Sequence, residues 1–451
     1  MEALLSQLAK ALKTELKSEK VIKKISIDSR DVDEATLFVA IKGERFDGHD
    51  FVKSVAESGA AAAVCSKRVE CEIPVIYVED TRQALLELAS FYRKSLKDLK
   101  IIGLTGSVGK TTTKEMTACV LSQKAPTLRT EGNLNNEIGV PKTLFRLEND
   151  TRFGVIEMGM DGKGQISELS RCAKPDCAII TNIGMSHIEN LGSREGILNA
   201  KLEMLDGMEK GSPLFLNGDD DMLKTVKNAD FNIITYGIEN PDCDFKAENI
   251  REEGLFTYFE VHFNGKVQNI KLPTVGIHNV YDALAAFSVG SFWGVEPSAA
   301  AQGLMNYVPS GMRQKIVTAG KITVIEDCYN ASPDSQRAAL NSLCSIAKGR
   351  KIAVIGDMLE LGEYSEQAHR ELGEYAAGCG LDALYTYGKE ARFTADSAYK
   401  AGMQDIFVYT DKQSLKSDLE NHIKDGDTVL FKASRGMRLE EVIFDLYKYW
   451  E

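Results

Sequence analysis

The stretch that decides the fold is the glycine-rich segment Thr105-Gly106-Ser107-Val108-Gly109-Lys110-Thr111. It follows the apolar run 101–104, which predicts a strand, and it precedes a predicted helix that begins at Lys110. Glycines let backbone N–H groups turn inward around phosphate oxygens, and the following helix N-terminus adds its positive dipole end. Lys110 can neutralise phosphate charge, and the Thr111 hydroxyl can bind Mg²⁺. The segment therefore predicts a site for a nucleoside triphosphate.

One position of this loop departs from the common pattern GxxxxGK[ST]. Leu104 stands where the first glycine would be, which leaves TGxxGKT. A glycine-rich turn that binds no nucleotide is the alternative interpretation. The strand before the loop and the helix after it favour the phosphate site.

The composition is that of an ordinary soluble globular protein. Hydrophobic residues make up 43% and charged residues 27% of the 451 residues, a length that suggests roughly two to four domains. The net charge of −12 disfavours nucleic acids and anionic membranes as partners. The nine cysteines stand singly, without a CxxC pair, which indicates a reducing compartment. No secretory signal and no apolar run of about 18 residues is found, so we expect a cytoplasmic protein without stable membrane insertion.

Apolar runs alternate with stretches of helical spacing and divide the chain into three α/β units. Strand-then-helix alternation of this kind predicts parallel sheets covered by helices. We expect a small N-terminal α/β domain over residues 1–98, a central P-loop domain with a parallel sheet over 99–311, and a C-terminal Rossmann-like α/β domain over 312–451. The cluster 309–311, which contains proline and glycine, is a natural linker.

The predicted elements of each unit follow from their apolar spacing. In the first unit they are strands at 37–41, 61–65 and 74–78 and a helix at 82–97. In the second unit they are strands at 101–104, 154–157, 178–181 and 213–217, an antiparallel insertion at 255–273 and a helix at 280–293. In the third unit they are strands at 322–325, 352–355, 383–386, 406–409 and 428–431.

Two polar residues follow neighbouring strands of the predicted central sheet. Glu157 lies at the carboxyl end of one strand, and His187 follows the next. Ligands of open α/β sheets bind at that edge, and a carboxylate there can hold Mg²⁺. Either residue alone is more often structural, but the pair beside a phosphate loop favours a metal site. Lys201 lies in a predicted helix, where a lysine is normally solvated, and nothing in its spacing singles it out.

Three polar clusters follow strands of the third unit in the same way. They occupy residues 326–333, 356–362 and 432–436. Their equivalent positions suggest a second ligand face at the strand ends. Ordinary turns between strand and helix are the alternative for any one cluster.

Taken together, these segments resemble the Mur ligases of bacterial cell-wall synthesis, and the resemblance covers essentially the whole chain. In the first unit, the segments 27–30, 37–44 and 47–51 look like the family's UDP-sugar-binding domain. The resemblance implies that Ser29, Arg30 and Asp47 bind substrate. The segment 130–141 is similar to the family pattern TxxNxNNxxGVP, which lies near the muramoyl-peptide and the γ-phosphate. It implies that the substrate contacts Asn133, Asn135 and Asn136.

The resemblance also assigns roles around the phosphate loop, because TGSxGKT looks like the family's own variant. It implies that ATP binds to Thr105, Gly106, Ser107, Val108, Gly109, Lys110, Thr111 and Thr112. One Mg²⁺ would be held by Thr111 and Glu157, and a second by His187 and a carbamylated Lys201. Lys110, His187, Lys201 and Arg313 are the residues that it implies for catalysis.

The segment 276–286 looks like the family element GxHNxxNALAA, which lies near the adenine and implies that Asn279 contacts the nucleotide. Asp282 replaces the usual second asparagine and cannot donate an amide hydrogen bond. In the third unit the resemblance implies a domain that closes over ATP and receives the incoming amino component. The resemblance implies that Arg313 and Asp327 of this unit bind ATP. It implies that Asn330, Ser434 and Arg435 bind the substrate. Lys432 lies on the same motifs.

Two motifs of the tripeptide-forming relatives, DNPR and DYAH, are missing, and DCYNASP stands where DYAH would be. This favours the branch that joins D-alanyl-D-alanine to UDP-N-acetylmuramoyl-tripeptide through an acyl phosphate, with ATP and Mg²⁺, in the cytoplasmic stage of peptidoglycan synthesis. Both substrates are small molecules, and we expect a monomer.

Three other interpretations can be weighed against this one, and the residues present argue against the second and the third. A P-loop NTPase that acts as a switch would hydrolyse slowly without an acceptor and would have no UDP-sugar site. A sister amide ligase of the folylpolyglutamate or cyanophycin synthetase type would lack the first-unit pattern. A paralogue without activity would have no need of Lys110, Glu157, His187 and Lys201.

Overall fold

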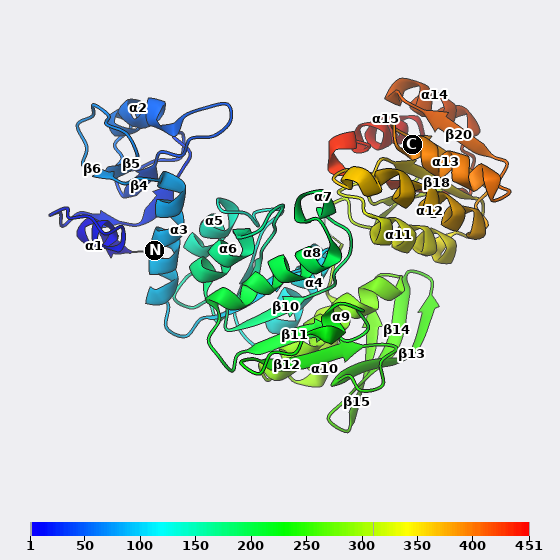
Figure 1. The fold of residues 1–451 in the computed structure, drawn as a ribbon, viewed down its shortest axis with the longest axis horizontal. Helices are drawn as coiled ribbons and strands as arrows, with labels where there is room; N and C mark the ends of the chain where they lie inside the picture. Colours follow the sequence, from blue (N-terminus) through cyan, green and yellow to red (C-terminus); the bar gives the residue numbers. More distant parts are fainter. Residues whose placement is uncertain (1, 310, 451) are drawn as a thin grey trace.

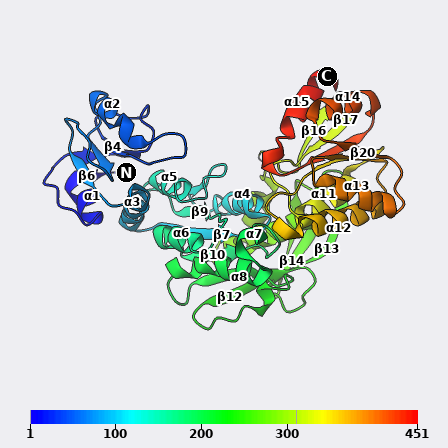
Figure 2. The same cartoon turned by 45° about the horizontal axis from the view of Figure 1, so that its top comes forward.

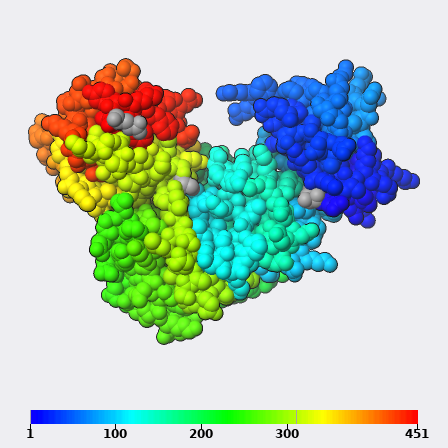
Figure 3. Space-filling view, turned by 180° about the vertical axis from the view of Figure 1, so that it is seen from behind, coloured from blue at the N-terminus to red at the C-terminus, as the bar shows by residue number. Residues whose placement is uncertain are grey.

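The computed structural model describes residues 2–309 and 311–450. Three regions follow one another along the chain, as Figure 1 shows from blue through green to red. The N-terminal and C-terminal regions lie at opposite ends of the central one, and the view from behind in Figure 3 shows an open space between them. Each region contains a sheet of its own, so the predicted α/β class is confirmed.

The N-terminal region is built on a small parallel sheet with the strand order β3-β4-β5-β6, beside a short β1-β2 ladder. The central strands β4 and β5 are buried along their whole length, which explains their uninterrupted apolar sequences. The elements are β1 (Ala3–Leu4), α1 (Leu5–Ala11), β2 (Val21–Ile22), β3 (Lys24–Ser26), β4 (Thr36–Val39), η1 (Gly48–Phe51), α2 (Val52–Glu57), β5 (Ala62–Cys65), β6 (Val75–Tyr77) and α3 (Thr81–Ser95).

The central region holds a sheet of strand order β15-β14-β13-β12-β11-β10-β7-β9-β8. Its strands are β7 (Lys100–Thr105), β8 (Thr127–Arg129), β9 (Phe153–Glu157), β10 (Cys177–Ile180), β11 (Pro213–Asn217), β12 (Asn232–Gly237), β13 (Phe245–Glu253), β14 (Phe256–Phe263) and β15 (Lys266–Leu272). Its helices are α4 (Lys110–Leu121), α5 (Gly139–Phe145), α6 (Gln165–Ala173), α7 (Ile188–Leu191), α8 (Arg194–Leu202), η2 (Glu203–Gly207), η3 (Leu223–Thr225), α9 (Ile277–Phe292) and α10 (Pro297–Met305).

Helices cover both faces of the parallel part of this sheet. Ile102 and Leu104 of β7 belong to one apolar cluster with α4, α9 and α10. Ile101 points to the opposite face and joins a second cluster with α5, α6 and α8. This alternation is the two-residue period of a strand, and it requires apolar residues at successive positions because neither face meets water.

The sheet is extended at one edge by an antiparallel part, as the sequence predicts for residues 255–273. β13, β14 and β15 pair antiparallel, and β14 alternates between partly and fully buried residues. The extension begins earlier than predicted, because β13 starts at Phe245. β12 joins it to the parallel strands.

The C-terminal region has a sheet of strand order β16-β17-β21-β18-β19-β20, parallel except for the edge strand β16. All the strands predicted there are present, and β16 is an addition. The elements are β16 (Lys315–Ala319), β17 (Ile322–Glu326), α11 (Pro333–Ile346), β18 (Lys351–Gly356), η4 (Gly362–Tyr364), α12 (Ser365–Gly378), β19 (Ala383–Tyr387), α13 (Ala391–Lys400), β20 (Ile406–Tyr409), α14 (Lys412–His422), β21 (Thr428–Lys432), η5 (Arg435–Met437) and α15 (Glu440–Trp450).

The three regions are joined by packing as well as by the chain. One cluster of buried apolar side chains runs from α3 through α5 and α6 to α11 and α12, elements that Figure 2 shows in sequence across the molecule. Arg93 of α3 binds Asp176 of the central region at 2.9 Å. The predicted linker at 309–311 includes Ser310, which lies outside the described residues, and the domain boundaries stay predictions. Within the described residues, no helix is long and apolar enough to cross a membrane.

Candidate functional site

A cavity of about 630 Å³ lies between the central and C-terminal regions, a size that suits a small-molecule site. Its walls come from the phosphate loop, from loops at the strand ends of the central sheet, and from the start of the C-terminal region. The predicted residues that line it are Thr105, Gly106, Ser107, Val108, Gly109, Lys110, Thr112, Asn135, Asn136, Glu157, His187, Lys201, Asn279, Arg313, Asp327 and Asn330, together with Lys432. Segments far apart in the sequence therefore share one site, as the sequence predicts.

The phosphate loop connects β7 to α4 and needs its glycines. Gly106 and Gly109 have φ values of +156° and +82°. A Cβ atom at Gly106 would lie 1.8 Å from Thr181 Oγ1, and one at Gly109 would lie 2.5 Å from Asp282 Oδ1. No larger residue fits either position without a shift of its neighbour. The glycines of the loop are therefore explained by close packing as well as by their turn conformation.

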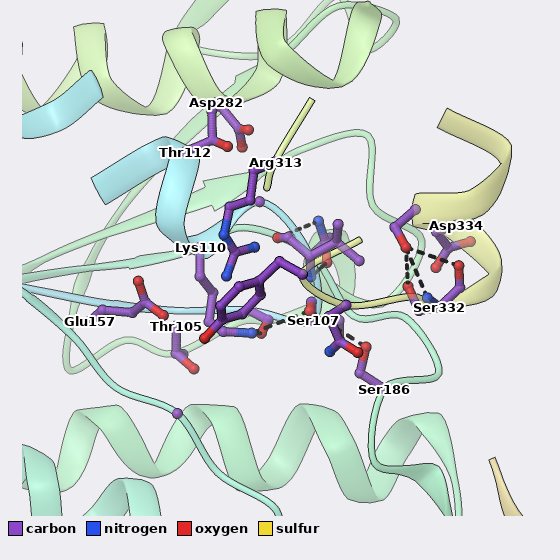
Figure 4. Close-up of a pocket in the computed structure, with 18 of the residues that line it drawn as sticks. Thr105, Ser107, Lys110, Thr112, Glu157, Ser186, Asp282, Arg313, Ser332 and Asp334 are labelled. Carbon is purple, nitrogen blue, oxygen red and sulfur yellow. Dashed lines mark hydrogen bonds between the residues drawn. The ribbon is translucent and has the colours of Figure 1, made fainter. Parts of the chain in front are cut away.

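Lys110 folds back across this loop. Its Nζ donates hydrogen bonds to the carbonyl oxygens of Gly106, at 2.8 Å, and Ser107, at 3.3 Å. Burial lowers the pKa of Lys110, while Glu157 acts in the opposite direction. Figure 4 shows Lys110 between Glu157 on one side and Arg313 on the other.

Glu157 ends β9 and is only 2% exposed. Its carboxylate accepts hydrogen bonds from Thr111 Oγ1, at 3.2 Å, and from Asn135 Nδ2, at 2.9 Å. Lys114 Nζ lies 3.4 Å from the same carboxylate. A buried carboxylate is thus held by one cation and two neutral donors, which offset the cost of its burial.

Lys114 is a residue that the sequence interpretation missed. It is completely buried on α4, one turn after Lys110, and its Nζ also approaches the carbonyl oxygen of Gly132 at 3.4 Å. The pattern could have indicated it, because residues four apart lie on the same face of a helix. A second lysine on the face that carries Lys110 must point toward the same sheet edge.

His187 is the N-cap residue of α7 and has a left-handed backbone, with φ at +61°. Its Nδ1 lies 2.6 Å from Glu360 Oε2 of the C-terminal region, although the two groups lack hydrogen-bond alignment. The contact with His187 lowers the pKa of Glu360. The imidazole therefore reaches the cavity from the central region while a carboxylate of the other region touches it.

Lys201 departs from the ordinary behaviour of a helix lysine. It lies on α8 with 2% exposure, and it lines the cavity. Burial, together with the nearby charge of Lys110, lowers its pKa well below the usual value. Lys201 therefore differs from the solvated lysine that is usual on a helix, because tertiary packing encloses this face of α8.

Around α9 the cavity wall is made of buried polar groups. Asn279 Nδ2 donates to Val275 O at 2.7 Å and to Gln314 Oε1 at 2.8 Å. Asp282 accepts a hydrogen bond from Thr113 Oγ1 at 2.7 Å. Burial raises the pKa of Asp282 to about 7. A carboxyl group that titrates near neutrality thus lies directly behind the phosphate loop.

The C-terminal region supplies cations and hydroxyl groups. The guanidinium of Arg313 stacks on the ring of Tyr329 at 4.1 Å. Lys432 Nζ binds Asp327 Oδ2 at 2.7 Å. Ser332 and Asp334, at the start of α11, face the phosphate loop from the side opposite Arg313, as Figure 4 shows. Ser332 belongs to the polar cluster 326–333 that the sequence indicates, whereas sequence reasoning missed Asp334, although Ser-Pro-Asp-Ser is a typical helix start.

Several predicted site residues lie outside the cavity lining. Thr111 reaches the site only through Glu157, and Asn133 is not among the lining residues. Ser434 accepts a hydrogen bond from Leu359 N at 2.9 Å, and Arg435 pairs with Glu440 at 2.7 Å. The predicted sugar-binding residues belong to the N-terminal region and do not line this cavity. They are Ser29, Arg30 and Asp47. Their roles stay predictions.

Family comparisons match all three regions. The model described as Mur ligase family, catalytic domain, matches residues 21–93. The Mur ligase middle domain matches residues 104–290. The model described as Mur ligase, glutamate ligase domain, matches residues 312–435.

Curated relatives and solved structures agree with those matches. A UDP-N-acetylmuramoyl-tripeptide–D-alanyl-D-alanine ligase of Bacillus subtilis is 40% identical over 94% of this chain and 93% of its own length. The Escherichia coli enzyme of the same name is 34% identical over 97% of each. A crystal structure of MurF from Acinetobacter baumannii superposes with a TM-score of 0.91, at 32% identity and 99% coverage of both chains. MurF ligase from Thermotoga maritima in complex with ADP gives 0.86, at 29% identity over 95% of this chain and 97% of its own.

Proposed function

This chain belongs to the Mur ligase family, and from that premise we propose that it joins D-alanyl-D-alanine to UDP-N-acetylmuramoyl-tripeptide at the expense of ATP. The observation that carries the proposal is the shared cavity. There the phosphate loop of the central region faces Arg313 and Asn330 of the C-terminal region. The near full-length likeness to ligases of this name supports the choice of substrates.

The reaction has two steps. The terminal carboxylate of the tripeptide attacks the γ-phosphorus of ATP, so that an acyl phosphate forms and ADP leaves. The amine of D-alanyl-D-alanine then attacks the acyl carbon, loses a proton and expels inorganic phosphate. In both steps the protein mainly positions the reactants and offsets negative charge. Lys110 and Arg313 would offset the negative charge of the phosphates from opposite sides. Lys110 would first have to give up its hydrogen bonds to the carbonyl groups of the loop.

Mg²⁺ suits the residues at the end of β9. The Thr111 hydroxyl and the Glu157 carboxylate are hard oxygen donors that touch each other at 3.2 Å beside the phosphate loop. We propose that they hold one Mg²⁺, which would offset phosphate charge when bound. Lys114 then holds the Glu157 carboxylate in place, because the ammonium lies 3.4 Å away.

We propose a second cation position at His187 and a carbamylated Lys201. An amine reacts with carbon dioxide only in its neutral form, giving a carbamate and releasing a proton. The lowered pKa of buried Lys201 favours that neutral form. The carbamate would replace an amine, which binds Mg²⁺ poorly, with oxygen donors. Among the described residues no three or more His, Cys, Asp or Glu side chains form a metal-binding group.

We propose that the three regions divide the substrates between them. Residues 1–98 would bind the UDP-sugar through Ser29, Arg30 and Asp47. Residues 99–311 would bind ATP, and Asn133, Asn135 and Asn136 would lie near the peptide. Residues 312–451 would bind the dipeptide, with contacts from Asn330, Ser434 and Arg435. We also propose that the protein acts in the cytoplasm as a monomer.

The assignment is tested by measuring ligase product and phosphate release with ATP, UDP-N-acetylmuramoyl-tripeptide and a panel of amino acceptors. D-Alanyl-D-alanine should be required for rapid phosphate release. Lys110→Ala should lower turnover by at least 10²-fold, since a phosphate-directed cation is lost, whereas Lys227→Ala, at an exposed lysine of the same region, should not. Phosphate release that ignores both substrates would favour a nucleotide switch, and preference for glutamate would favour a sister amide ligase.

A further inference from the structure

The contact between His187 and Glu360 crosses from the central to the C-terminal region. Nδ1 of His187 and Oε2 of Glu360 lie 2.6 Å apart. His187 opens α7, while Glu360 lies in the loop between β18 and η4. The sequence pattern marks this loop, residues 356–362, as a polar cluster at a strand end, and the ligase chemistry described above leaves it without a role.

The backbone on both sides of this contact is unusual. His187 and Glu360 have φ values of +61° and +65°, a left-handed conformation that residues with side chains seldom adopt. Such conformations persist where the surrounding structure holds them, and they gather at functional sites. Two of them meet in a single side-chain contact, so the local backbone is shaped to bring these groups together.

The loop that carries Glu360 is seated directly on α7. A Cβ atom at Gly362, whose φ is +53°, would lie 3.1 Å from Cγ of Glu189. A side chain at this position would require the Glu189 side chain to shift by a few tenths of an ångström. The end of the loop that carries Glu360 thus lies close against α7, the helix that His187 caps.

The contact decides which imidazole nitrogen is free. With Nδ1 facing a carboxylate, Nε2 is the nitrogen that His187 can offer to the cavity that it lines. Histidines that bind metals commonly donate their other N–H group to a carboxylate, which fixes the ring orientation. Glu360 has the chemistry of such a partner and lies 2.6 Å from Nδ1, although the two groups are not aligned for a hydrogen bond. It comes from a different region of the chain.

We propose that Glu360 is a positioning residue for His187, and that it orients the imidazole only while the C-terminal region is seated on the central one. This inference rests on the proposed function, in which His187 serves a cation position. Glu360 is 58% exposed, and exposed ion pairs add little stability. Its effect is therefore on the orientation of one ring and not on the folding of the protein.

The orientation is tested first in the full-length protein without nucleotide or metal. Side-chain ¹⁵N NMR of its histidines, with the His187 signal identified by His187→Gln, reports which ring nitrogen carries the proton. Glu360→Ala should change the His187 signals, and Glu360→Gln, which keeps an oxygen acceptor, should change them less. Glu363→Ala, at an exposed position of η4 directly after this loop, should leave them as they are. Unchanged His187 signals in Glu360→Ala would overturn the proposal.

A second measurement separates this proposal from the metal role of His187. Glu360→Ala should raise the Mg²⁺ concentration for half-maximal ligase activity about tenfold and change KM for ATP less than twofold. Added to His187→Ala, it should have no further effect, and independent effects of the two substitutions would overturn the positioning role. If His187→Ala alone keeps the wild-type Mg²⁺ dependence, the proposed cation position fails, and the NMR comparison still decides whether Glu360 orients the ring.

Discussion

At the residue scale, the buried charges around Glu157 illustrate how much a site of this kind depends on matched partners. Thr111, Asn135 and Lys114 each reach its carboxylate. An isolated charge in such a place would be driven to neutrality, whereas a paired one keeps its charge. These contacts therefore hold the Glu157 carboxylate in place before any ligand arrives.

Removing Lys114 should be costly. In Lys114→Met, Glu157 would be left buried with two neutral donors, and the free energy of unfolding should fall by about 3–5 kcal/mol. Chemical denaturation measures this loss. The double variant Lys114→Met/Glu157→Gln should recover most of it, because the uncompensated charge is gone. A double variant as unstable as the single one would show that the lysine acts by packing and not by charge.

Asp282 gives the protein a pH dependence of known sign. Its pKa is raised from 3.8 to about 7 in the folded state, so the folded protein binds this proton more tightly than the unfolded chain. The associated stability is fully present below pH 3.8 and is lost as the pH rises toward 7. Asp282→Asn can still accept the Thr113 hydrogen bond and avoids burying a charge. It should therefore be more stable than the natural protein at pH 8, by roughly 2–4 kcal/mol.

The measurement is the difference in thermal midpoint between Asp282→Asn and the natural protein at a series of pH values. The difference should be small near pH 4 and should grow steadily up to pH 7. A constant difference across this range would mean that Asp282 does not change its protonation there.

At the element scale, the unit formed by β7, the phosphate loop and α4 is the best-predicted part of the molecule. An apolar run, a glycine-rich turn and a helical stretch each have a local cause, so the sequence alone locates them. The strands β12 and β16 were missed because they are only partly buried and carry polar residues. Their pairing depends on neighbouring strands, which spacing within one segment does not reveal.

The burial of Lys201 has a similar origin. Its helix, α8, has the spacing of any amphipathic helix, and a lysine on it is normally solvated. Only the assembled fold places that lysine beside Lys110 in a cavity wall. For the same reason the contact of Glu360 with His187 could not be predicted, since it joins segments more than a hundred residues apart.

Alanine substitutions at Gly109 and Gly164 allow the cost of backbone strain to be measured separately from the cost of a steric clash. Both have positive φ values, +82° and +86°, and both precede a helix. A Cβ atom at Gly109 would meet Asp282, whereas one at Gly164 would meet nothing within 4 Å. Gly164→Ala should cost about 1–2 kcal/mol of stability, and Gly109→Ala should cost more and should also abolish ATP binding.

Calorimetric titration with ATP, together with thermal unfolding, checks both variants. Equal losses of stability would mean that Asp282 yields easily to the added methyl group. Normal ATP binding by Gly109→Ala would contradict the tight packing described for the loop.

At the scale of the whole molecule, α3 connects the N-terminal region to the central one. Arg93 binds Asp176 at 2.9 Å and the carbonyl oxygen of Ala173 at 3.2 Å, with 12% of its side chain exposed. Arg93→Ala should lower the free energy of unfolding by roughly 1–3 kcal/mol, because Asp176 keeps Lys100 as a partner. Lys94→Ala, at the exposed neighbouring position on α3, is the matched control and should change stability little.

Urea denaturation measures the loss of stability, and limited proteolysis of the folded protein shows in which region it arises. Cleavage in Arg93→Ala should increase first in the N-terminal region, because its seating on α6 is weakened. Uniform cleavage over all three regions would contradict a local role for this arginine.

The apolar cluster that crosses all three regions has a consequence for large movements. It includes Ile188 and Leu191 of α7 as well as Met358 and Leu361 of the C-terminal region. Closely packed side chains interlock, so the two surfaces can pack well in only a few relative positions. Any arrangement intermediate between two such positions would expose apolar surface to water. A shift of the C-terminal region should therefore be a jump between separate packings. Single-molecule distance measurements should resolve distinct populations with abrupt exchange, in place of one broad distribution.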